Sequence, residues 1–132
     1  MGLVQVARSL ALILIVFGLG ALVAPGSVAD FAGLQIEPSG GNGFLEIGAA
    51  FGGVPIALGA IALYSTFTAS ASAGALLAAV GWVFAAGAAG RLVVGSMSAP
   101  TAPSLVGWLL VLLDASLAVV FLLASRAVES EM

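Results

Sequence analysis

The chain has 132 residues, of which 62% are hydrophobic and only 7% are charged. Soluble domains carry about 25% charged residues, so a composition this apolar indicates that a lipid bilayer is the solvent. The sequence contains no Cys and no His. Disulfides, thiolate nucleophiles, iron–sulfur clusters and the usual zinc and copper sites are thereby excluded, and we expect no metal and no cofactor. The net charge of −3 and the lack of a basic patch argue against a nucleic-acid partner.

Four apolar stretches each have about the 20 residues that a bilayer-spanning helix needs. Backbone polar groups in lipid must be hydrogen-bonded within their own segment, so each stretch predicts a helix. The predicted helices cover residues 3–24, 44–66, 74–95 and 104–125. The sequence therefore predicts an all-α membrane protein, in which residues 1–132 form a single domain and an antiparallel bundle of four transmembrane helices.

The first apolar stretch also has features of a cleavable signal peptide. Arg8 would be its basic residue, and Ser27-Val28-Ala29 resembles a cleavage site of small residues. The apolar run is longer than the apolar region of most signal peptides. We therefore expect this stretch to be retained as the first transmembrane helix.

The few charges outside the apolar stretches predict the topology. Arg8 and Arg126 lie near the first and last helix ends, whereas the connection over residues 25–43 has no Lys or Arg. The positive-inside rule then places both termini in the cytoplasm, and we expect the bacterial cytoplasmic membrane. Within that connection, Ser27 followed three residues later by Asp30 predicts a short interfacial helix with Ser27 as its N-cap.

Three charged residues lie inside the apolar stretches: Glu46, Arg91 and Asp114. A charge in the middle of a membrane costs roughly 2.5–3.5 kcal/mol on insertion scales, so such groups usually point inward and pair. Counting along the predicted helices puts the arginine within reach of both carboxylates, because its long side chain can extend along the helix. The three residues are the candidate site. A polar clamp that fixes helix register and a proton or ligand pathway are both open.

Small residues recur on the predicted helix faces and would let neighbouring helices approach closely. Pro55 is expected to kink the second helix and to free the backbone carbonyl of Phe51. The residues assigned to helix packing are Gly48, Gly52, Pro55, Gly59, Gly87, Gly95 and Gly107.

The stretch from Phe44 to Gly53, followed by Ala57-Leu58-Gly59, resembles the motif of a family of small bacterial membrane proteins catalogued as domain of unknown function 4345. The pair Gly90-Arg91 and the acidic Asp114 also fit that family. The resemblance extends over nearly the whole chain. It implies a four-helix membrane fold and a pairing of Glu46 with Arg91.

Two positions depart from the family pattern. Gly48 stands where the family usually has Arg, and Phe51 stands where it usually has Tyr. The family has no established activity, so the resemblance implies no reaction. The chain is also faintly similar, in size and topology, to DoxX-type membrane proteins, which are associated with quinone and thiol redox systems.

Three functions follow as hypotheses, the first of them leading. The chain is a non-enzymatic structural or accessory membrane subunit, with the lipid bilayer and either further copies or a larger membrane complex as partners. Alternatively it is a small transporter or proton pathway that uses Glu46, Arg91 and Asp114. A third hypothesis is a membrane redox protein that binds a quinone or lipid. No residue is assigned a catalytic role.

Overall fold

The computed structural model describes residues 2–32, 41–68, 70, 72–97 and 105–130. Its elements are α1 (Leu3–Val23), α2 (Pro25–Ala32), α3 (Gly41–Ile47), the π-helix η1 (Gly48–Gly53), α4 (Val54–Phe67), α5 (Ala73–Met97) and α6 (Leu105–Ser130). The segments α3, η1 and α4 follow one another without a break. They form one long helical stretch.

The described residues contain four helices that are long and apolar enough to cross a membrane, which confirms the four predicted apolar helices. The second stretch begins at Gly41, one turn earlier than the predicted residue 44. The last helix continues to Ser130, beyond the predicted residue 125. That extension carries Arg126 and Glu129, and a hydropathy pattern detects only the apolar part of a helix, not the polar turns that continue it.

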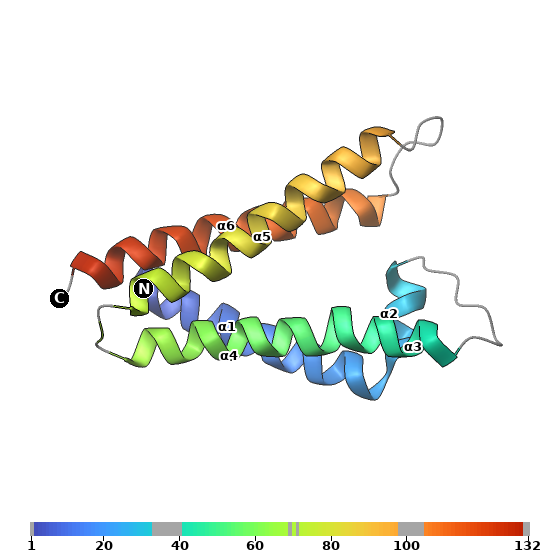
Figure 1. Ribbon diagram of the computed structural model, residues 1–132, viewed down its shortest axis with the longest axis horizontal. Helices are drawn as coiled ribbons and strands as arrows, with labels where there is room; N and C mark the ends of the chain where they lie inside the picture. The colour runs from blue at the N-terminus through green and yellow to red at the C-terminus, as the bar shows by residue number, and fades with distance from the viewer. Residues whose placement is uncertain (1, 33–40, 69, 71, 98–104, 131–132) are drawn as a thin grey trace.

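The four long helices form two antiparallel hairpins, α1 with α4 and α5 with α6 (Figure 1). The hairpins meet at the end that holds both termini and the α4–α5 connection, which we call the packed end. They diverge toward α2 and α3, which we call the open end (Figure 1). The four helices therefore do not pack along their whole length as the predicted bundle would.

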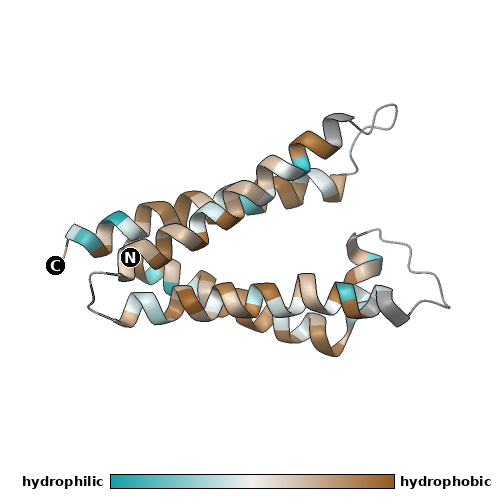
Figure 2. Ribbon diagram, in the orientation of Figure 1, coloured by the Kyte–Doolittle hydropathy of each residue, from teal (hydrophilic) through white to brown (hydrophobic). Residues whose placement is uncertain are grey.

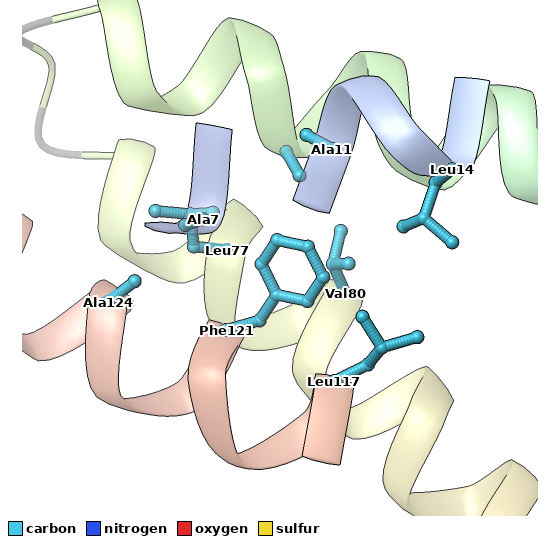
Figure 3. Packing of buried hydrophobic residues seen from close by; sticks show 9 residues of the cluster. Ala7, Ala11, Leu14, Leu77, Val80, Leu117, Phe121 and Ala124 are labelled. Atoms are coloured by element: carbon cyan, nitrogen blue, oxygen red, sulfur yellow. The ribbon is translucent and has the colours of Figure 1, made fainter. Parts of the chain in front are cut away.

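The hydrophobic core lies toward the packed end and receives side chains from all four long helices (Figure 3). Phe121, Leu77 and Val80 are its largest fully buried side chains. The core cluster consists of Ala7, Ala11, Leu14, Ala62, Leu77, Val80, Leu117, Phe121 and Ala124. Three of its four α1 and α4 members are alanine and the fourth is Leu14, and these mostly small side chains let the two hairpins come together here.

Glycines bring α1 and the second stretch into close contact. A Cβ at Gly18 would lie 2.6 Å from the carbonyl oxygen of Gly52, and a Cβ at Gly59 would lie 2.6 Å from that of Ala11. Real Cβ atoms do not approach backbone oxygens so closely, so a larger residue at either position would push the helices apart. The α1–α4 hairpin depends on these small residues for its backbone contact.

Pro55 is accommodated by the π-helical segment that precedes it. The π-helix Gly48–Gly53 is followed directly by α4, and Pro55 is the second residue of α4. The N–H of Val54 donates to the carbonyl of Ala49, five residues back. Wider turns of this kind insert one residue into a helix, and they occur where the regular bonding pattern is interrupted. A π-helix thus precedes Pro55, while the kink and the free Phe51 carbonyl stay predictions.

The short helix predicted in the first connection is present as α2, but its predicted N-cap is wrong. The helix begins at Pro25, so Ser27 is its third residue. Proline suits the first helical position because its missing N–H would be unbonded there in any case. The presence of Pro25 outweighs the capping pattern of Ser27 and Asp30.

Apolar residues occupy most of the length of the four long helices (Figure 2). In each of the four apolar helices, only 22% to 28% of the most apolar 18-residue segment is buried inside the protein, so most of its side chains point outward. Val23, Leu45 and Leu105 are among the most exposed, at 86%, 73% and 77%. A surface of this kind suits acyl chains, which are as apolar as leucine.

Candidate functional site

The candidate site consists of one ion pair between α5 and α6. Nε of Arg91 donates to Oδ2 of Asp114 at 2.9 Å. The Asp114 side chain is 13% exposed and the Arg91 side chain is 41% exposed. The carboxylate is thus enclosed while the guanidinium extends beyond it, and the bond joins the two helices of one hairpin.

The ion pair continues the core face of both helices. Asp114 precedes Phe121 by seven residues on α6, and Arg91 follows Phe84 by seven residues on α5. Residues seven apart lie on the same side of an α-helix, and the rings of Phe84 and Phe121 stack with centroids 6.1 Å apart. The ion pair therefore occupies the position along the core face that comes next toward the open end.

Gly87 makes room for the carboxylate. A Cβ at this glycine would lie 3.1 Å from Oδ2 of Asp114, which is tighter than ordinary van der Waals contact. The small residue lets α6 bring its aspartate against the backbone of α5. A larger residue at position 87 would disturb the ion pair before it disturbed the core.

Glu46 lies apart from this pair. It is an exposed residue of α3, in the hairpin that diverges from α5 and α6 at the open end (Figure 1). Within the described part of the chain it makes no ion pair. The sequence places Glu46 and Arg91 at similar depths, but depth along a helix does not determine the lateral separation of two hairpins. Of the three predicted residues, the structure brings together Arg91 and Asp114.

The residues assigned to packing differ in how tightly they are enclosed. A Cβ at Gly52 would lie 2.6 Å from a methyl carbon of Leu22, whereas one at Gly48 would be in ordinary contact with the same residue at 3.7 Å. Gly59 has the backbone contact described above, and Pro55 is half-buried. Gly95 lies in α5 and Gly107 lies in α6.

The sequence marked Arg8 as a topology signal and as the basic residue of a possible signal peptide, but not for the contacts that it makes at the packed end. The terminal nitrogen of Arg8 donates to the carbonyl of Thr66, and its guanidinium lies 4.2 Å from the centroid of the Phe67 ring. The last carbonyls of a helix have no partner within that helix, and a cation near them is favourable. An antiparallel hairpin puts the start of its first helix beside the end of its second. The predicted topology could therefore have placed Arg8 beside the last turn of α4.

A second contact at the packed end joins the two ends of the α5–α6 hairpin. Oε1 of Glu129 lies 2.6 Å from where a Cβ of Gly74 would be, so the carboxylate covers the first turn of α5. Backbone N–H groups are unpaired at a helix N-terminus, and a negative charge is stabilised there. Gly74 leaves the space that the carboxylate occupies.

The chemistry available to the described residues is limited. They contain no group of three or more His, Cys, Asp or Glu side chains that could hold a metal ion. The ion pair provides one carboxylate already bonded to a cation. Such a pair can join two helices, and it can exchange a partner or a proton.

No protein-family model, no curated protein and no solved structure matches the chain. The resemblance to domain of unknown function 4345 therefore stays a prediction, and so does the fainter likeness to DoxX-type proteins.

Proposed function

We propose that this chain is a non-enzymatic structural or accessory protein of the bacterial cytoplasmic membrane, with both termini in the cytoplasm. The observation that carries this proposal is the direct bond between Arg91 and Asp114. Two opposite charges on adjacent helices offset each other's cost in lipid and fix the register of α5 against α6. A clamp of this kind needs no substrate.

The apolar surface supports the same proposal. Glycine faces and outward aromatic residues such as Trp82, which is 66% exposed, offer contact to lipid, to further copies or to a larger membrane complex. Cross-linking in native membranes, followed by mass spectrometry of what co-purifies, tests this role. A chain that stays monomeric and partnerless at native abundance contradicts it.

A proton or ion pathway is the second candidate, favoured by the uneven exposure of the pair. The Arg91 side chain is 41% exposed, so another anion can reach it and the bond to Asp114 can be exchanged. A quinone- or lipid-binding redox protein is the third hypothesis from the sequence, and no contact among the described residues favours it.

Proton flux separates the first two candidates. The chain is reconstituted in liposomes that contain a pH-sensitive dye, and a potassium diffusion potential drives proton entry. The structural role predicts the same slow leak with wild type, with Asp114→Asn and without protein. A flux that needs wild-type protein and is lost in Asp114→Asn would overturn it and establish the pathway.

A further inference from the structure

The open end holds charges of opposite sign on the two diverging hairpins. Glu46 is an exposed carboxylate on α3, and Arg91 is a partly exposed cation on α5. The sequence has three Arg and no Lys, and Arg8 and Arg126 lie on segments at the packed end. Arg91 is therefore the cation available to Glu46 at its own end of the molecule.

The two residues stand at the same height on their hairpins. Arg91 lies 18 residues beyond Ala73, and Glu46 lies 21 residues before Phe67. At about 1.5 Å per residue, both are roughly 30 Å from the connection between α4 and α5. A rotation of one hairpin toward the other about that connection would bring the two side chains together.

Little packing opposes such a rotation. The core that joins the hairpins lies toward the packed end, so a small change of angle there moves the open end most (Figure 3). Beyond the core, Gly52 lies against Leu22 within one hairpin, and Gly87 lies against Asp114 within the other. The two hairpins can move as units because each is packed internally.

We propose that the two hairpins close at the open end by placing the Glu46 carboxylate on the guanidinium of Arg91, so that Arg91 bridges two carboxylates. A guanidinium has five N–H donors, and the bond to Asp114 uses Nε. An unpaired carboxylate in an apolar setting is costly in lipid. The closed state is therefore favoured, because it pairs Glu46 with a cation. Asp114 competes with Glu46 for the same cation and limits how far the equilibrium moves.

Distances between spin labels test the closure directly, because the chain has no Cys and needs no background substitutions. The outer pair is Leu45→Cys with Leu92→Cys, whose native side chains are 73% and 46% exposed. The control pair at the packed end is Tyr64→Cys with Ala75→Cys, also exposed positions on the two hairpins. Pulsed electron resonance is measured on the full chain in lipid nanodiscs.

The expected result is two distances for the outer pair and one for the control pair. Glu46→Gln should lower the ratio of the short to the long distance about fivefold, the upper range for an ion pair near water. Asp114→Asn should raise that ratio, because it frees Arg91 for Glu46. General loss of structure would shift both variants in the same direction, so opposite shifts are specific to the proposed competition.

Three results would overturn the closure. One is a single outer distance that neither substitution changes. Another is a shift of the same sign in Glu46→Gln and Asp114→Asn. The third is a control pair that changes as much as the outer pair, which would show that the whole molecule rearranges rather than pivots.

Discussion

The two ends of the molecule are held in different ways. At the packed end, alanine and leucine side chains around Phe121 join both hairpins into one core, and Arg8 covers the end of α4. At the open end, the α5–α6 hairpin is joined within itself by the bond from Arg91 to Asp114, and the other hairpin stands apart. Apolar packing therefore joins the hairpins, and the charge pair of Arg91 and Asp114 joins the helices within one of them.

The largest effect is expected from removing the core ring at the packed end. Phe121→Ala should lower the free energy of unfolding by about 3 kcal/mol, because it leaves a cavity between the hairpins. Loss of packing contacts contributes most of this, since lipid would solvate the ring about as well as the core does. Val119→Ala on the same helix is the control: its side chain is 55% exposed and should change stability by under about 0.5 kcal/mol. Steric trapping in bicelles measures both, and equal losses would contradict a core at this end.

The charge pair comes next. Asp114→Ala should cost about 2 kcal/mol, below the ~3–5 kcal/mol of fully buried pairs because Arg91 is partly exposed. The double variant Asp114→Leu with Arg91→Met should recover most of that loss, since it removes both charges and keeps volume. Thermal unfolding in detergent compares the two. A double variant as unstable as the single one would show that the bond itself, and not the stranded charge, determines stability.

A glycine substitution probes the contact between α1 and α4. Gly59→Ala should destabilise by about 1–2 kcal/mol, because its Cβ would lie 2.6 Å from the carbonyl oxygen of Ala11. Gly53→Ala is the matched control, with nothing within 4 Å of its Cβ. The control should be neutral or slightly stabilising, as alanine is the better helix former. The same steric-trapping assay applies, and similar stability of the two variants would show that the helices separate easily.

The order of these effects shows what the sequence can predict. The four apolar helices followed from composition and length, because a bilayer requires long internally bonded helices. Asp114 beside Arg91 was predictable, since antiparallel neighbours with a short connection bring residues at matched depth together. The core stripe of α6 was also implicit in the seven-residue spacing from Asp114 to Phe121.

The position of Glu46 shows what the sequence could not predict. Its depth follows from counting residues, but the angle between hairpins depends on how the small residues of both fit together at the packed end. The contact of Arg8 with Thr66 was missed for a different reason. A backbone carbonyl is a partner that no residue type reveals, so the signal was only indirect: an antiparallel hairpin puts Arg8 beside the end of α4.

Arg8 gives a smaller and more local effect. Arg8→Gln should cost about 1 kcal/mol, since it removes the charge over the Phe67 ring and the bond to the Thr66 carbonyl. Phe67→Leu keeps the bond and should lose about half as much. Arg126→Gln, at an exposed position of α6, controls for net charge. Hydrogen exchange at the end of α4 should rise in Arg8→Gln and not in Arg126→Gln. Unchanged exchange in Arg8→Gln would contradict the role of Arg8 as a cap of α4.

The smallest expected effect lies at the first turn of α5. Glu129→Gln should cost about 0.5 kcal/mol, because the carboxylate lies against Gly74 in the first turn of α5, where the helix dipole favours a negative charge. The loss should shrink in high salt, which screens an exposed charge but leaves apolar packing at Phe121 unaffected. Urea or detergent titration at two salt concentrations measures this difference. If the loss is independent of salt, Glu129 acts by filling the space above Gly74. Van der Waals packing, and not charge, would then join the ends of α5 and α6.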